Sequence, residues 1–239
     1  MVSLIVNDTP DTTARSVGSG PTFNSTFDAD RLKKILSQCN PAVSDKLRFW
    51  FNETLNSAVD QQKESSHCDN WIIADSSRLL EKARQHFQNL QFSAVHHGPF
   101  EVGVNWHIQQ LDQLQSGKFM LSTGEYHLAV DGPGLGGRNT HFVLEMADQI
   151  FFKNVLSWSS DKLKQVTILS VGTDGTDGPT DAAGACFNYD LFTQSLSQGI
   201  SPEGALKSFD SYRFFEKMGG LIKTGPGPIN LMDIRAICL

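Results

Sequence analysis

The stretch SVGTDGTDGPTDAAGA, residues 170–185, places Asp174, Asp177 and Asp181 among glycines and threonines. It follows the β-branched apolar run of residues 165–172, which is typical of a buried strand. In open α/β sheets, ligands bind at the carboxyl ends of strands. The spacing of the three aspartates fits neither a calcium loop nor a Walker A loop. The stretch therefore predicts an α/β fold with a polar site, in which the aspartates bind magnesium or accept a proton, or else only cap turns.

A second glycine cluster, DGPGLGGRN, covers residues 131–139. Gly132, Gly134 and Gly137 match the pattern G-x-G-x-x-G between an expected strand and an expected helix. Glycine lets backbone N–H groups face an anion at the positive end of a helix, and Arg138 adds donors for a carboxylate or phosphate. A plain strand-to-helix turn is the alternative. A dinucleotide site would also need an acidic residue about 20 positions later at a strand end, and none is there.

Short apolar runs alternate along the chain with longer amphipathic stretches, which is the α/β pattern. The predicted strands are residues 3–7, 70–74, 92–97, 118–123, 125–132, 165–172, 219–225 and 230–238. The predicted helices are residues 27–39, 42–56, 75–90, 100–115, 138–156, 188–199 and 201–209. A domain boundary is expected near Ser116, which divides the chain into residues 1–115 and 116–239.

The composition is that of a globular protein, with 39% hydrophobic and 19% charged residues in a chain of 239. The net charge of −6, with mixed signs along the chain, argues against a nucleic-acid partner. The apolar runs are too short to span a membrane, and no signal peptide is evident at the N-terminus. We therefore expect a cytoplasmic protein whose four scattered cysteines are reduced. The seven histidines lack metal-site spacing and are expected to be structural.

Several motifs together resemble the MOFRL domain, the C-terminal part of the D-glycerate 2-kinase family, which is also named hydroxypyruvate reductase. They are VGTDGTDGPTDAAGA at 171–185, LSTGEYHLAVDGPGLGGRNTHFVLEMA at 121–147 and GGLIKTGPGPINLMDIRAI at 219–237. Two upstream segments, at 4–22 and 70–83, also resemble family elements. The resemblance implies two three-layer α/β/α units. The first, residues 1–115, would be an incomplete Rossmann-like domain, and the second, residues 116–239, a MOFRL domain with a mixed sheet.

The same resemblance implies ATP-dependent phosphorylation of D-glycerate at its 2-hydroxyl, with Mg²⁺, in a cleft between two domains. It implies catalytic roles for Arg138, Asp174 and Asp177, and metal binding by Asp174 and Asp181. The implied substrate and phosphate contacts are Gly124, Glu125, Gly134, Gly136, Gly137, Asn139, Thr176, Thr224, Asn230, Ser19 and Gly20.

The sequence departs from the family pattern in three ways. The family's N-terminal Gly-Lys-Ala motif and its Gly-Gly-Gly-Ser-Ala loop are absent. TGPGPINL, residues 224–231, lacks two family hydroxyls, and RNTHFVL, residues 138–144, lacks a family carboxylate. We therefore expect a truncated or split kinase, either active or inactive alone, with a complementing N-terminal half or a second copy as partner. The alternatives are a NAD(P)H-dependent hydroxypyruvate reductase and a non-catalytic remnant that binds a partner chain.

Overall fold

The computed structural model describes residues 1–10, 12–23, 31, 34, 49–50, 53 and 68–239, and it divides into two compact units. The first unit comprises Met1–Ile5 and Arg15–Trp71, and the second comprises Val6–Ala14 and Ile72–Leu239. The helices predicted at 27–39 and 42–56 fall almost entirely outside the described residues. The incomplete Rossmann-like domain and the boundary at residue 115 stay predictions.

The described part of the first unit contains a short 3-10 helix, η1 (Val17–Ser19), next to strand residues. Strands β1 (Val2–Val6) and β2 (Asp69–Ala74) form a two-stranded sheet, as their apolar patterns predict. Thr22 ties the loop after η1 to this sheet, because its hydroxyl donates to Oδ1 of Asn70 at 2.6 Å. The Asn70 amide donates back to the Thr22 carbonyl at 3.0 Å.

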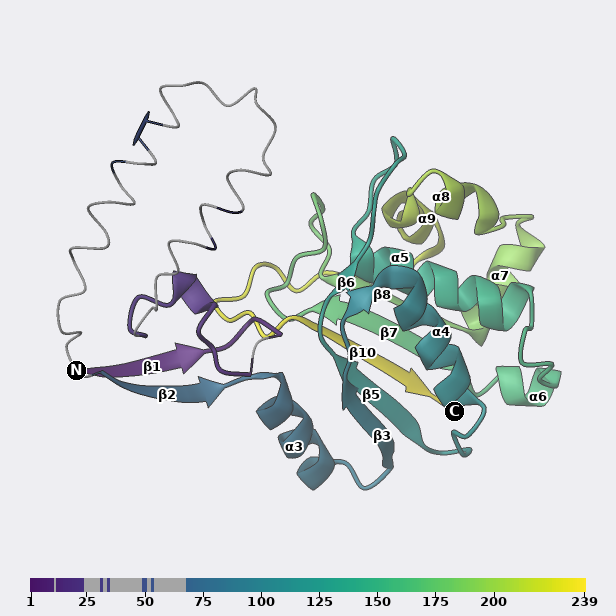
Figure 1. The fold of residues 1–239 in the computed structure, drawn as a ribbon. Coiled ribbons are helices and arrows are strands. Elements are labelled where there is room, and N and C mark those ends of the chain that lie inside the picture. Colours follow the sequence, from purple (N-terminus) through teal and green to yellow (C-terminus); the bar gives the residue numbers. More distant parts are fainter. Residues whose placement is uncertain (11, 24–30, 32–33, 35–48, 51–52, 54–67) are drawn as a thin grey trace. The chain divides into compact units, whose positions relative to one another are not determined.

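The second unit is built on a mixed six-stranded sheet, ordered β3-β5-β10-β7-β8-β9 (Figure 1). The strands are β3 (Leu90–Val95), β5 (Phe119–Thr123), β7 (Thr167–Gly172), β8 (Gly184–Asn188), β9 (Leu221–Ile222) and β10 (Asp233–Cys238). Only β3 and β5 are parallel, and β10 runs antiparallel to both of its neighbours. This confirms the predicted α/β class with a mixed sheet.

Helices pack on both faces of this sheet. The helices of the unit are α3 (Ser76–His86), α4 (Phe100–Leu111), α5 (Arg138–Ala147), α6 (Ser160–Leu163), α7 (Tyr189–Ser197), α8 (Glu203–Lys207) and α9 (Ser211–Met218). The main core joins α4, α5 and α9 to one face, where Phe142 and Phe215 are fully buried with Ile237 of β10. Helix α3 packs Leu80 on the other face of the sheet, beside Ile234. Ile234 is three positions before Ile237 in β10, so the two side chains point to opposite faces.

Helix α3 begins as its sequence predicts, because Asp75 accepts a hydrogen bond from the backbone of Arg78 at 2.7 Å. The long helix predicted at 138–156 was wrong in its second half. It ends as α5 at Ala147 and continues as a π-helical turn, η2 (Asp148–Phe152). No helix among the described residues has the length and apolar character needed to cross a membrane.

The strand predicted at 125–132 was also wrong in length. Only β6 (Tyr126–His127) forms, paired with β4 (Gly98–Pro99), because β4 offers only two residues for pairing. Residues 128–137 instead make an irregular segment that leads into α5. Strand β8 and helix α9 were not predicted.

Candidate active site

The first turn of α5 holds Arg138 in a fixed orientation. Its Nε donates to Oδ2 of Asp233 at 2.7 Å, and its Nη2 donates to Oδ1 of Asp233 at 3.1 Å and to Glu125 at 2.7 Å. Burial lowers the pKa of Arg138, but these acceptors outweigh it and raise that pKa overall. The guanidinium therefore stays charged, and its Nη1 has no hydrogen-bond partner among the described residues.

Asp233, at the start of β10, is the centre of this arrangement and is 1% exposed. Besides Arg138 it accepts a hydrogen bond from the Asn139 amide at 2.9 Å. The side-chain carbonyl of Asn139 in turn accepts from the hydroxyl of Ser170 on β7 at 2.6 Å. The antiparallel register of β10 between β5 and β7 thus places groups about 95 residues apart in sequence within one network.

A second arginine lies behind the first. Arg235 is 2% exposed, donates to the Gly124 carbonyl and lies 3.4 Å from Oδ2 of Asp233. Its guanidinium stacks 3.9 Å from the centre of the Tyr126 ring, and its Nη1 is buried without a partner. Burial raises the pKa of Tyr126 to about 12, and its hydroxyl lies 2.9 Å from Nδ1 of His96. Arg235 thus links Tyr126 and Gly124, the neighbours of Glu125, to Asp233, the partner of Arg138.

Asp177 caps the N-terminus of α5. Its Oδ1 accepts from the backbone N–H of Asn139 and its Oδ2 from that of Thr140, each at 2.8 Å. Burial raises the pKa of Asp177, while these two bonds oppose the rise. The protein's own carboxylate therefore occupies the positive helix end that the glycine pattern predicted for an external anion.

Asp174 lies in the same loop but is only partly buried. Its Oδ1 accepts from the backbone of Thr176 at 3.0 Å, and its Oδ2 has no partner among the described residues. The segment of residues 223–232 holds the loop in place, because the backbone N–H of Gly227 donates to the Asp174 carbonyl at 2.6 Å. The unpaired Oδ2 of Asp174 therefore lies on a loop whose backbone is held by a hydrogen bond.

The other end of the 223–232 segment is anchored through Thr173. Its hydroxyl accepts from the backbone of Leu231 at 2.7 Å and donates to the Met232 carbonyl at 2.7 Å. Asn230 shapes the turn by accepting from the Met232 backbone at 2.8 Å. Thr224 donates to the Gly225 carbonyl at 3.1 Å and lies near Gly175 of the aspartate loop.

Asp181 has a different environment. Its two oxygens accept from the Tyr212 hydroxyl at 2.7 Å and from Lys223 at 2.8 Å. The bond to Lys223 is the main cause that lowers the pKa of this exposed carboxyl. Asp181 is not among the residues that line the cleft described below. Its predicted role as a metal ligand stays a prediction.

The glycine cluster owes its residue type largely to protein packing. A Cβ at Gly134 would collide with the backbone of Ser208–Asp210, and one at Gly132 would meet the Ser208 carbonyl at 2.7 Å. The Gly134 N–H also donates to that carbonyl at 2.9 Å. A Cβ at Gly136 would collide with the Ser211 hydroxyl, and one at Gly137 with Asp177. The glycines therefore let the segment before α5 lie directly on its neighbours.

A cleft of about 500 Å³ opens beside these groups. It is lined by Tyr126, His127, Leu128, Val130, Gly136, Gly137, Arg138, Asp174, Thr176, Asp177, Gly178 and Pro179. Arg138 supplies the cation of this lining, and Asp174 supplies a carboxylate with an unpaired oxygen. Such a pair can hold an anionic substrate and accept a proton or bind a metal.

Predicted site residues from two distant segments meet here. The predicted residues that line the cleft are Gly136, Gly137, Arg138, Asp174, Thr176 and Asp177. Two more, Glu125 and Asn139, are hydrogen-bonded to Arg138 and Asp177. Four other predicted residues lie in the backbone segments around the cleft, namely Gly124, Gly134, Thr224 and Asn230. Ser19 and Gly20 belong to the first unit and stay predictions.

The sequence reasoning did not place Asp233, Arg235 and Tyr126 in the site. A usable signal was present, because Asp233 and Arg235 are two positions apart in an expected strand and so share one face. Two charged residues on the buried face of a strand require partners. Those partners come from β6 and α5, which a sequence pattern does not pair with β10.

Comparison with known proteins agrees with this geometry. Residues 118–233, which include the aspartate loop, the glycine cluster and Asp233, match the MOFRL family. This part of the chain is similar to the MOFRL family.

Relatives extend over the whole chain. It is 29% identical to a putative hydroxypyruvate reductase of Agrobacterium vitis, covering 100% of this chain and 62% of that protein. It is 25% identical to D-glycerate 2-kinase of Thermotoga maritima and 26% identical to glycerate 2-kinase of Pyrococcus horikoshii, covering 98% of this chain in each case. The chain spans only 55% and 54% of those two proteins.

Solved structures share the fold. The crystal structure of glycerate kinase from Thermotoga maritima superposes with a TM-score of 0.79 at 23% identity, covering 100% of this chain and 56% of that one. A Pyrococcus horikoshii protein superposes with a TM-score of 0.71 at 23% identity, with the same coverage. The whole chain therefore shares the fold of the matched part of these two structures, and residues 118–233 lie within it.

Proposed function

We propose that the cleft at α5 binds D-glycerate and the γ-phosphate of ATP, and that the protein acts in phosphorylation of the 2-hydroxyl. The arrangement of Arg138 carries this proposal. Two of its nitrogens are held by Asp233 and Glu125, so Nη1 is left to bind a carboxylate or phosphoryl oxygen in the cleft. Phosphoryl transfer depends mainly on such positioning and charge neutralisation.

Asp174 is proposed to serve Mg²⁺ or the proton of the reacting hydroxyl. The 2-hydroxyl oxygen would bond to the γ-phosphorus as the bond to the ADP oxygen breaks, and its proton would pass to a carboxylate. The described residues contain no group of three acidic, histidine or cysteine side chains that could hold a metal. A magnesium ion fits nevertheless, since it needs only one or two carboxylates and takes its other ligands from water and phosphates.

Asp177 is assigned a supporting part in this proposal. Both of its oxygens already accept backbone N–H bonds at the start of α5. It would thereby fix the position of Arg138, the first residue of that helix.

The hydroxypyruvate reductase alternative finds less support in the cleft. A dinucleotide fingerprint uses its glycines to let the backbone approach the pyrophosphate. Here the space beside Gly132 and Gly134 is filled by the backbone of residues 208–210. NADH oxidation in the presence of hydroxypyruvate is the assay that separates the two activities.

The direct test is ADP release from Mg-ATP with D-glycerate, comparing the wild-type chain with Arg138→Ala and Arg78→Ala. Arg78 is an exposed arginine on α3 and serves as the matched control. We expect glycerate-dependent turnover, by the chain alone or by its mixture with an N-terminal half of a full-length relative, that Arg138→Ala lowers at least 100-fold and Arg78→Ala leaves unchanged. Equal turnover in the two variants would contradict the proposal.

The predicted partners are tested separately, because the relatives are longer than this chain. Calorimetric titration of D-glycerate into the wild-type chain measures substrate binding without requiring turnover. Sedimentation of the same sample, alone and with an N-terminal half of a full-length relative, tests the predicted partner. Binding of D-glycerate that needs Arg138, with turnover only in the mixture, is the result expected for a split kinase.

A further inference from the structure

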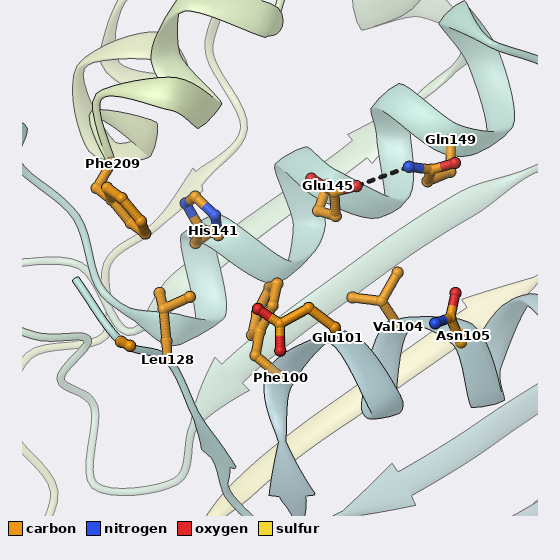
Figure 2. A pocket seen from close by; sticks show the side chains of 10 residues that line it. Phe100, Glu101, Val104, Asn105, Leu128, His141, Glu145, Gln149 and Phe209 are labelled. Atoms are coloured by element: carbon orange, nitrogen blue, oxygen red, sulfur yellow. Dashed lines mark hydrogen bonds between the residues drawn. The ribbon is translucent and has the colours of Figure 1, made fainter. Parts of the chain in front are cut away.

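A second pocket, of about 360 Å³, lies between α4 and α5 (Figure 2). It is lined by Phe100, Glu101, Val104, Asn105, Leu128, Ala129, His141, Glu145, Gln149 and Phe209. Leu128 also lines the cleft, so the two cavities are neighbours. The volume is in the range of small-molecule sites.

His141 is the buried polar group of this pocket. It is 6% exposed, and its Nδ1 is buried without a hydrogen-bond partner. The imidazole stacks on Phe209 with ring centres 5.1 Å apart and lies 5.3 Å from the Phe100 ring. Burial lowers the pKa of His141 to about 4, so at neutral pH the ring is uncharged and offers one acceptor nitrogen.

The charges of the lining are all negative at neutral pH. Glu101 and Glu145 supply two carboxylates from facing helices, whereas no lysine or arginine among the described residues lines the pocket. Gln149 donates to Oε1 of Glu145 at 2.7 Å and orients that carboxylate at the pocket rim. The cleft differs in this respect, because Arg138 is part of its lining.

We propose that this pocket is a binding site for a small aliphatic diammonium compound. Each ammonium group is a compact cation with three donors, and the carboxylates of Glu101 and Glu145 with the imidazole are acceptors. The side chains of Val104 and Leu128 suit the methylene chain, and the rings of Phe100 and Phe209 add apolar surface that also attracts cations. The proposal does not depend on the reaction in the cleft.

Calorimetric titration with 1,4-diaminobutane tests the site, using 1,4-butanediol as the uncharged compound of equal length. We expect saturable binding of the diamine by the wild-type chain and none of the diol. The double variant Glu101→Gln/Glu145→Gln should weaken diamine binding at least tenfold, because it removes both charges and preserves side-chain size. His141→Phe, which keeps the ring and removes the nitrogens, should weaken it severalfold.

Two controls exclude other sources of binding. Glu81→Gln/Glu203→Gln removes two carboxylates from the exposed surfaces of α3 and α8 and should bind the diamine as the wild type does. Asp174→Asn removes the partly free carboxylate of the cleft and should also leave binding unchanged. Absence of binding, equal binding of the diol, or equal weakening in either control would overturn the proposal. Thermal melts of all variants verify that each is folded.

Discussion

Asp233 and Arg138 form a bidentate pair in which a carboxylate that is 1% exposed meets two nitrogens of one guanidinium at 2.7 and 3.1 Å. The same carboxylate also faces the buried Arg235 and the amide of Asn139. One residue on β10 therefore both orients the arginine of the cleft and neutralises charge in the core. We therefore expect both stability and D-glycerate binding to depend on this position.

We expect Asp233→Asn to lower the free energy of unfolding by about 3–5 kcal/mol, since it removes the charge opposite a buried arginine. The variant should also lose D-glycerate affinity, because Arg138 loses its bidentate partner. Urea unfolding and calorimetric titration measure the two effects. Asp161→Asn, at an exposed ion pair with Lys164, is the control and should change neither. Similar midpoints for both variants would show that the buried pair contributes little.

Asp177→Asn separates a capping role from a direct chemical role. The amide keeps one acceptor oxygen and loses the other, so we expect a stability loss of about 1–2 kcal/mol, comparable to that of the α3 cap variant Asp75→Ala. Because the cap positions Arg138, turnover should fall only in proportion to D-glycerate affinity. A folded variant with unchanged affinity and a turnover number reduced more than 100-fold would instead assign Asp177 to proton transfer.

The elements that sequence predicted well are those that local rules determine. Strand β7 is β-branched, and α3 has a capping aspartate in front of an amphipathic run. Strand β8, GACFN, was missed because small residues give a weak strand signal, and it is stabilised by pairing with β7. The predicted strand at 125–132 failed for the converse reason, since an alternating pattern forms a strand only where a partner edge is available.

The candidate site shows the same division. Arg138 and the aspartate loop stand out from residue type and glycine context alone. Asp233, Arg235 and Tyr126 do not, because their roles arise from the placement of β10 between β5 and β7. The cap formed by Asp177 likewise joins two loops that are about 40 residues apart. Long-range register decides these contacts, and a single sequence carries no direct signal for it.

Two buried histidines predict a loss of stability in mild acid. Burial lowers the pKa of His107 to about 3 and that of His141 to about 4, whereas an unfolded histidine titrates near 6.5. The unfolded chain therefore takes up protons first as the pH falls below 6.5, and stability rises with pH across this window. The cost is about 1.4 kcal/mol per pH unit for each histidine, or roughly 4 kcal/mol for both at pH 5.

His141→Phe provides the measurement of this effect. Urea unfolding at pH 7, 6 and 5 should give the variant a mean pH slope smaller than that of the wild type by about 1 kcal/mol per unit, since the unfolded histidine is only partly protonated above pH 6. The comparison of slopes cancels the carboxylates, which titrate in both proteins. His107 is left in place because its ring nitrogens contact the Gly103 carbonyl and the Ser122 hydroxyl, each at 2.8 Å. Parallel slopes for the two proteins would mean that His141 is protonated in the folded state.

Gly137→Ala tests whether the contact between the glycine cluster and the aspartate loop is tight. The backbone of Gly137 has a φ of −130°, which alanine adopts freely, so the cost comes from its Cβ meeting Asp177 and from the lower preference of alanine for the N-cap. We expect destabilisation of about 1–3 kcal/mol in urea unfolding. The control, Gly204→Ala in α8, places its Cβ where no atom lies within 4 Å and should stabilise by about 0.5–1 kcal/mol. The opposite signs follow from the two positions, because Gly137 is the N-cap of α5 with Asp177 against it, whereas Gly204 lies within α8 in open space. A stabilising Gly137→Ala would show that the aspartate loop moves away from α5 at little cost, and Arg138 would then lack the fixed position on which the proposed phosphoryl transfer depends.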